Sequence, residues 1–256
     1  MNMWRVAAGT VIVTAAVALS STPAMAAGPT GPMAYTCTGG DIPSGVYASI
    51  TVSGFCDVPD GAVITVVGNV NVGPGAVLDA QSAPSTITVG HNVTAAAGSL
   101  LGLGCQPDFP HNTGHPCVID PSGHSVVTVD GNVTSTDANT VLLNGITVNK
   151  NVTLAGGGGD IPWSIKNNAI AGNLTVSNVT ANWLGVLFNV IAGNTTLTNI
   201  TATDPGDPGR KVFVVRNTIG KNLNCTGLAP GVSGGFFPGE VNTVARNATG
   251  QCASLV

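Results

Sequence analysis

The chain of 256 residues is only 8% charged and carries a formal net charge of −4, with 35 glycines. It offers no basic stripe, which argues against nucleic acid as a partner. Its hydrophobic content of 43%, much of it β-branched, can offset the conformational entropy of folding, so intrinsic disorder is also disfavoured.

The N-terminus has the pattern of a secretory signal peptide over residues 1–26. Arg5 precedes an apolar run from Val6 to Leu19, and small residues around Ala26 suit a signal peptidase. The run is too short to span a bilayer, and no later segment replaces it. We therefore expect a mature chain that is secreted or associated with the cell envelope, without a transmembrane segment.

Residues 27–60 are predicted to form an N-terminal cap, and all six cysteines of the chain follow the signal. An even number of cysteines in an exported chain indicates disulfide bonds. Metal ligation is the competing interpretation, but no Cys-x2-Cys spacing occurs. The grouping along the chain favours the pairs Cys37–Cys56, Cys105–Cys117 and Cys225–Cys252, each closing a short loop.

An asparagine recurs at intervals typical of one coil of a right-handed parallel β-helix, about 20 to 25 residues. Two longer intervals indicate loop insertions near residues 103–125 and 203–212. We therefore predict a single-domain, all-β solenoid of this type over residues 61–225, with about 20 to 23 residues per coil. The recurring asparagines are Asn69, Asn92, Asn132, Asn151, Asn173, Asn194 and Asn222.

Positions around the recurring asparagine have constant character. The residues one and three places after it are mostly apolar and are predicted to point inward, with an outward threonine or asparagine between them. This pattern produces Asn-x-Thr triplets, as at Asn173, so solenoid geometry explains them and glycosylation is the disfavoured alternative. A glycine often precedes the asparagine, as at Gly172, and is expected to supply a positive φ at the corner.

One column changes character along the chain. Five residues before the corner asparagine it holds isoleucine or valine in the first coils and asparagine in the later ones. Asparagines at one place in successive coils can stack as an amide ladder. We predict such a ladder in the C-terminal half, formed by Asn168, Asn189 and Asn217.

The first insertion holds three of the four histidines between Cys105 and His124. Within it, Asp108, His111 and His115 form a candidate metal site, because His-x3-His with carboxylates can bind a divalent cation. The alternative is a disulfide-closed surface loop whose polar residues are simply solvated.

Two tryptophans, Trp163 and Trp183, are 20 residues apart and so fall on adjacent coils. Stacked near one edge, with Asp160 beside them, they would form an aromatic platform for sugar rings. Packing beneath a loop is the alternative role.

The second insertion, "DPGDPGRK", supplies Asp204, Asp207 and Arg210. These could bind calcium or a uronate, although Asp-Pro-Gly is also ordinary turn chemistry. After it, residues 226–256 are predicted to cap the open strand edges at the C-terminal end.

The outward threonines raise another hypothesis, because a regular threonine array can match a crystalline ligand such as ice. A lattice extends in two dimensions and needs paired threonines on one strand. The pattern predicts only one threonine per strand in each coil, and the first-strand column stops after Thr147.

Several stretches resemble a family of uncharacterised exported actinobacterial proteins: "GVYASITVSGFCDVPDGAVITVVGNVNVGPGAVLDA", "GSLLGLGC" and the ending, with "NTIGKNLNCTGLAP" and "VNTVARNATGQCASL". The resemblance covers nearly the whole mature chain. Such proteins are similar in architecture to the pectate-lyase-like β-helix superfamily. The resemblance implies this fold but supplies no catalytic residues.

Because many β-helix proteins process polysaccharides, carbohydrate chemistry is the hypothesis to test. The chain has one glutamate, Glu240, and none of its aspartates forms a recognisable catalytic set. The preferred prediction is a non-catalytic structural or ligand-binding solenoid without cofactor, whose partners include polysaccharide or cell-envelope material. The alternative is a calcium-dependent polysaccharide lyase or a glycoside hydrolase, with its site in residues 204–216 or 108–124. The oligomeric state stays open.

Overall fold

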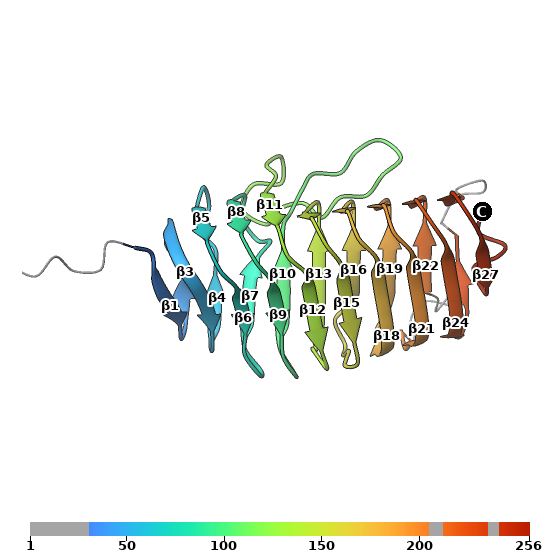
Figure 1. Cartoon of the computed structure of the whole chain (residues 1–256), viewed down its shortest axis with the longest axis horizontal. Helices are drawn as coiled ribbons and strands as arrows, with labels where there is room; N and C mark the ends of the chain where they lie inside the picture. Colours follow the sequence, from blue (N-terminus) through green and yellow to red (C-terminus); the bar gives the residue numbers. More distant parts are fainter. Residues whose placement is uncertain (1–30, 205–211, 235–240) are drawn as a thin grey trace, which may run out of the picture. The chain divides into compact units, whose positions relative to one another are not determined.

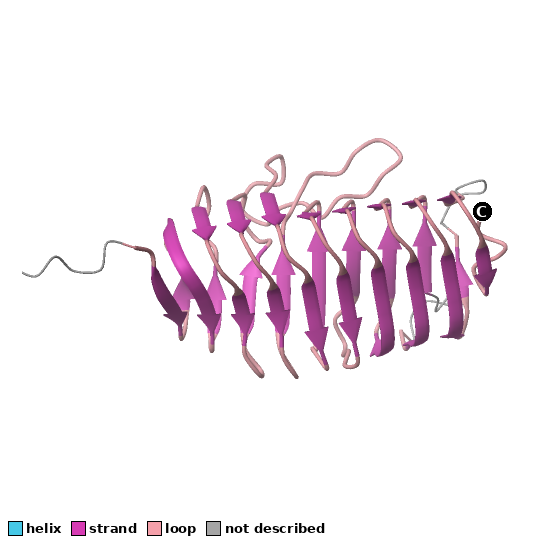
Figure 2. Ribbon diagram, in the orientation of Figure 1, coloured by secondary structure: helices cyan, strands magenta, loops and turns pink. Residues whose placement is uncertain are grey.

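The computed structural model describes residues 31–204, 212–234 and 241–256. In these ranges all regular elements are strands, and all pairings between them are parallel (Figures 1 and 2). The predicted parallel β-helix is therefore confirmed. The predicted signal peptide, Asp207 and Arg210 lie outside the described residues.

Each coil contains three strands, and each strand pairs with its equivalents in the coils before and after it. The first strands are β5 (Val63–Val66), β8 (Thr86–Val89), β11 (Val126–Val129), β14 (Thr147–Val148), β17 (Ala169–Ile170), β20 (Val190–Ile191), β23 (Thr218–Ile219) and β26 (Thr243–Val244). The second strands are β6 (Val70–Val72), β9 (Val93–Ala95), β12 (Val133–Thr136), β15 (Val152–Ala155), β18 (Leu174–Ala181), β21 (Thr195–Ala202), β24 (Leu223–Ala229) and β27 (Ala248–Gly250).

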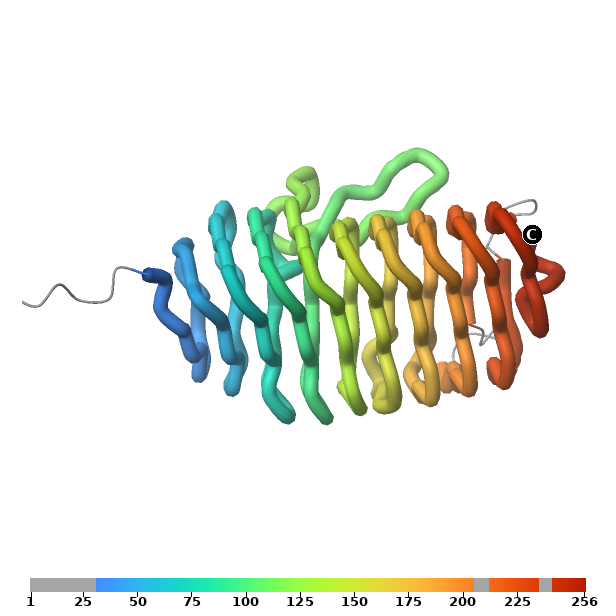
Figure 3. Tube along the Cα trace, in the orientation of Figure 1, coloured from blue at the N-terminus to red at the C-terminus, as the bar shows by residue number. Residues whose placement is uncertain are grey.

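The third strands form a separate nine-stranded sheet. Its members are β2 (Gly40–Asp41), β4 (Phe55–Asp57), β7 (Val77–Ala80), β10 (Leu100–Leu103), β13 (Thr140–Asn144), β16 (Trp163–Lys166), β19 (Leu184–Leu187), β22 (Val212–Val215) and β25 (Val232–Ser233). We call the outward sides of the three strand sets the first-, second- and third-strand faces. Figure 3 shows the coils stacked in chain order, with the insertion after β10 projecting from them.

The paired strands extend beyond residues 61–225, the range predicted for the solenoid. β1 (Met33–Cys37) pairs with β3 (Gly45–Val52), and β3 pairs with both β5 and β6. At the other end, β25, β26 and β27 pair in register with the strands of the preceding coil. Segments of both predicted caps therefore take part in the coil stacking.

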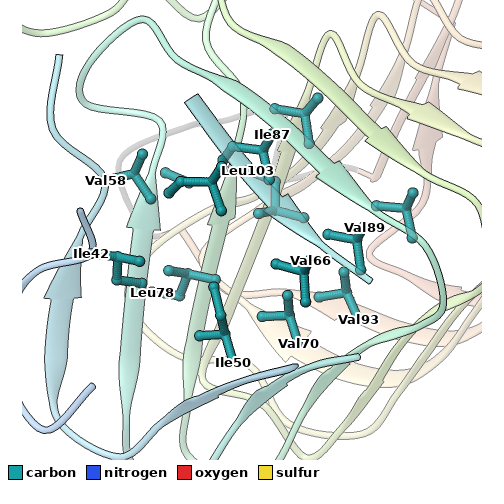
Figure 4. Close-up of a pocket in the computed structure, with 14 residues that line it drawn as sticks. Ile42, Ile50, Val58, Val66, Val70, Leu78, Ile87, Val89, Val93 and Leu103 are labelled. Carbon is teal, nitrogen blue, oxygen red and sulfur yellow. The ribbon is translucent and has the colours of Figure 1, made fainter. Parts of the chain in front are cut away.

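The inward columns are filled as the alternation predicted. The residues one and three places after each corner asparagine are buried from Val70 to Cys225, while those between them are exposed or half-buried. Valine, isoleucine and leucine dominate this core, because inward side chains of successive coils stack directly on one another. In the N-terminal coils the aliphatic side chains leave a small apolar space of about 20 Å³ (Figure 4).

The glycines before the corner asparagines do not have the expected positive φ. They are needed because the preceding coil comes too close for a side chain. A Cβ at Gly172 would lie 2.5 Å from the carbonyl oxygen of Lys150, and one at Gly193 would lie 2.5 Å from that of Gly172. The prediction of a conformational role was therefore wrong, and the role is steric.

The corner asparagines themselves form an amide ladder that the sequence analysis missed. Asn173 donates from both its backbone N–H and its Nδ2 to Oδ1 of Asn151, at 2.9 and 3.1 Å. Asn194 does the same to Asn173, and each member thus donates to the coil before it. From Asn92 to Asn222, Nδ2 of each asparagine donates to Oδ1 of the asparagine before it, so the recurrence of asparagine at this corner has a structural cause. The ladder runs through Asn69, Asn92, Asn132, Asn151, Asn173, Asn194, Asn222 and Asn247.

The predicted ladder in the C-terminal half is confirmed and extends one coil further, to Asn242. Its members are buried, and each donates to the coil after it, opposite to the corner ladder. Asn189, for example, donates from N and Nδ2 to Oδ1 of Asn217, at 3.0 and 2.9 Å.

The three predicted disulfide bonds, Cys37–Cys56, Cys105–Cys117 and Cys225–Cys252, are all present. Cys37–Cys56 links β1 to β4, Cys225–Cys252 links β24 to the turn after β27, and the middle disulfide lies in the insertion after β10. Among the described residues, no helix is long and apolar enough to cross a membrane.

Candidate functional site

The third-strand face carries three chemically distinct zones along the solenoid axis. Its N-terminal zone is acidic, because Asp41, Asp57 and Asp79 stand in register on β2, β4 and β7. Burial raises the pKa of Asp57, and the neighbouring carboxylates of Asp79 and Asp41 raise it further. Asp79 is already engaged in a turn, accepting hydrogen bonds from the backbone of Gln81 and from Ser82. The strand register therefore keeps three carboxylates close together, where their negative charges repel one another.

The middle zone is covered by the insertion between β10 and β11. Lys166, at the end of β16, donates from Nζ to the carbonyl oxygen of Gly114 at 2.9 Å. Asn112 donates from Nδ2 to Oδ1 of Asn167 at 2.7 Å, and Asn167 donates in turn to the carbonyl oxygen of Thr113 at 3.1 Å. These contacts fix the insertion against the outside of the sheet.

The contact between the insertion and the sheet has the charges of a partly buried site. Burial lowers the pKa of the Lys166 ammonium, while the Asp108 carboxylate raises it in part. Burial also lowers the pKa of His115, and the charge of Lys166 lowers it further. Both effects follow from the cost of removing a cation from water.

The predicted metal site is not assembled. Oδ1 of Asp108 accepts a hydrogen bond from the backbone of Gly114 at 2.7 Å, and the carbonyl oxygen of His111 accepts one from Arg216. Among the described residues, no three histidine, cysteine, aspartate or glutamate side chains come together in a way that could hold a metal. Asp108, His111 and His115 instead help to shape and attach the loop.

The C-terminal zone of this face is aromatic. Trp183, Leu187, Phe188, Phe213 and Val215 form an apolar cluster outside the main core. The rings of Trp183 and Phe213 meet edge to face, with centroids 6.1 Å apart and planes at 85°. The guanidinium of Arg216 lies 5.9 Å from the centroid of the Phe188 ring, within reach of a cation–π interaction.

Gly185 determines how Trp183 lies. A Cβ at Gly185 would come within 2.8 Å of the indole ring, so the glycine lets the ring lie against the sheet. Because Gly185 is paired with Phe213 on the next coil, the indole meets the phenyl ring across the two strands. The aromatic pair therefore depends on a residue without a side chain.

The predicted pairing of two tryptophans is wrong. Trp163 is paired with Leu184, not with Trp183. Because neighbouring residues of a strand point to opposite sides, the two tryptophan side chains project to opposite sides of the sheet. Trp163 is fully buried in the core, and its Nε1 donates to the carbonyl oxygen of Asn139 at 3.0 Å. Only Trp183 is left to form a platform.

The predicted carboxylates do lie near this remaining tryptophan. The backbone N–H of Asn182, next to Trp183, donates to the carbonyl oxygen of Gly159, next to Asp160, at 2.9 Å. The N–H of Asp204 donates to the carbonyl oxygen of Asn182, also at 2.9 Å. Asp160, Trp183 and Asp204 therefore come from three adjacent coils to one corner of the solenoid.

Three residues of the cluster, Phe188, Phe213 and Arg216, were not predicted from the sequence. The register of Phe213 with Gly185 is given by the pairing of β19 and β22, because the insertion between these strands changes the spacing from Trp183 to Phe213. Comparisons of this chain with protein-family models, with curated proteins and with solved structures find no match. The assignment of a function therefore depends on the chemistry of these faces.

Proposed function

We propose that this chain is a secreted, non-catalytic β-solenoid that binds polysaccharide on its third-strand face. The observation that carries the proposal is the half-buried Trp183 on the outside of the sheet, whose ring is held edge to face against the buried ring of Phe213. The cluster around Trp183 is apolar, and it lies outside the main core of the solenoid. Sugar rings present apolar C–H faces that pack on such rings.

The polar groups around the cluster suit the same ligand. The carboxylate of Asp160 supplies acceptors at the adjoining corner, while Lys166 and Arg216, which donate to the carbonyl oxygens of Gly114 and His111, place positive charge on the other side. A few polar groups around an apolar surface fix the orientation of a ligand, while the sheet beneath keeps them in place. An extended chain of sugars could follow the solenoid axis across several coils.

The test is retention of the purified protein on plant, fungal and bacterial polysaccharides, with and without calcium. We expect Trp183→Ala to weaken binding about tenfold, the size expected for loss of one aromatic contact. Gly185→Ala should weaken binding as well, because the added methyl group displaces the indole. Phe55→Ala is the matched control, because Phe55 is an exposed aromatic residue on the same face but outside the cluster.

Two results would contradict the proposal. Equal binding by wild type and Trp183→Ala would show that the aromatic cluster is not the binding site. Release of unsaturated or reducing ends during the incubation would replace the non-catalytic function with the lyase or hydrolase alternative.

A further inference from the structure

The second-strand face carries an unbroken column of small polar side chains. Its positions are paired in register through ten successive strands, from β1 to β27. Eight are threonine and two are asparagine. In order they are Thr36, Thr51, Asn71, Thr94, Thr134, Thr153, Thr175, Thr196, Asn224 and Thr249.

A second column runs beside the first, contrary to the prediction of one threonine per strand. β12, β15, β18, β21 and β24 continue past the inward residue, so a second outward side chain follows two places later. Strand β21 thus presents Thr196 and Thr198, and strand β12 presents Thr134 and Thr136. The second column is Thr136, Ala155, Ser177, Thr198 and Thr226, again in register.

These two columns are uncharged and consist mainly of threonine. Each threonine offers a methyl and a hydroxyl group on a side chain whose χ1 is restricted by β-branching. No hydrogen bond within the described residues engages the hydroxyls of Thr134, Thr153, Thr175 and Thr196. All four side chains are at least partly exposed. The face therefore presents free, neutral groups at fixed positions.

The spacing of the array is regular in both directions. Neighbouring strands are about 4.8 Å apart, and alternate residues along a strand are about 6.6 Å apart. The corner ladder of asparagines runs along one side of this face and holds the coils in register. In Figure 2 no described loop crosses the front of β12, β15, β18 and β21.

We propose that the second-strand face binds the surface of ice. A neutral two-dimensional array fits a neutral lattice, and its hydroxyls can join ordered water while its methyl groups fill the spaces between. Charged side chains would impose their own hydration shells, and the two columns contain none. The absence of aromatic side chains from the columns separates this face from the sugar-binding cluster on the third-strand face.

The experiment is inhibition of ice recrystallisation, measured as mean crystal size in an annealed frozen film of the purified protein. We expect wild type to keep crystals small, and Thr196→Lys to raise the concentration needed at least tenfold. Thr218→Lys is the matched control, because Thr218 is an exposed outward threonine on the neighbouring first-strand face. Its activity should equal that of wild type. Circular dichroism and melting temperature establish that each variant is folded.

Three outcomes would overturn the inference: crystal growth with wild type that matches buffer, equal loss in both lysine variants, or full activity of folded Thr196→Lys. A second substitution, Thr175→Lys, separates misfolding of one variant from loss of the array. The result is independent of the proposed function, because Trp183→Ala should leave ice growth inhibition unchanged and Thr196→Lys should leave polysaccharide binding unchanged.

Discussion

The N-terminal and C-terminal coils turn from the third strand to the next first strand in different ways. Between β4 and β11, five or more residues connect them, as between Asp57 and Val63. From β13 to β23 only two residues do so, and the first is left-handed, with φ of 58° at Asn167 and at Phe188. The second is a ladder asparagine in three of these corners.

The difference shows what the buried ladder accomplishes. At each sharp corner, Nδ2 of the asparagine donates to a third-strand carbonyl of the coil before, as from Asn189 to Ile165 at 2.8 Å. Its Oδ1 accepts the backbone N–H of the equivalent residue in that coil, Asn168. An amide thus satisfies two backbone groups that a sharp corner leaves unpaired, whereas the longer corners have room for an aliphatic side chain.

The largest effect is expected for Asn189→Leu. It removes the partners of Asn168, Ile165 and Asn217 together, all in the buried core. Each buried polar group left unsatisfied costs about 1 to 3 kcal/mol, so the free energy of unfolding should fall by about 4 kcal/mol. Urea denaturation followed by circular dichroism measures the loss.

Asn173→Ala is the matched control from the corner ladder. Asn173 is exposed, so water can replace the lost hydrogen bonds and the expected loss is about 1 kcal/mol. Equal losses in Asn189→Leu and Asn173→Ala would contradict a special role for the buried ladder.

The reverse exchange in the N-terminal half should also destabilise the protein. Ile87 occupies the same column, between Ile64 and Val127. Ile87→Asn would bury an amide between two aliphatic neighbours that cannot bond to it, at a cost of about 3 kcal/mol. Thermal and urea unfolding of this variant give the measurement. Unchanged stability would mean that the longer corner tolerates an isolated amide.

The smallest expected effect is a pH dependence of stability that arises from Asp57 in the N-terminal coils. In the folded protein, burial and the charges of Asp79 and Asp41 raise the pKa of Asp57, so the folded state binds its proton more tightly than the unfolded state. Stability should therefore fall as pH rises from the ordinary aspartate pKa through the raised one. Asp57→Asn should be slightly more stable than wild type at neutral pH.

This advantage of Asp57→Asn should disappear below the ordinary aspartate pKa. The gain is small because solvent screens a carboxylate that is only partly buried. Melting temperatures of both proteins from acidic to neutral pH test it. A gap of the same size at every pH would show that the substitution acts through packing and not through charge.

Much of the fold was predictable, because each coil repeats one arrangement and the columns read directly from the sequence. The amide column at Asn168, Asn189 and Asn217 was found in this way, and the corner ladder could have been, since the asparagine itself recurs. Trp163 was misplaced because spacing fixes the coil but not the register within it, and one residue reverses the direction of a side chain. The aromatic cluster depends on pairing across an insertion, which sequence spacing cannot resolve.

The opposite directions of the two ladders have an electrical consequence. Each side-chain amide is a dipole, and stacked amides add along the axis as peptide units do in a helix. In the C-terminal coils the corner amides and the buried amides point in opposing senses, one of each per coil, so their fields largely cancel. The coils before Asn168 carry only the corner set. The side-chain amide dipoles of the ladders therefore add along the N-terminal half of the solenoid and largely cancel along the C-terminal half.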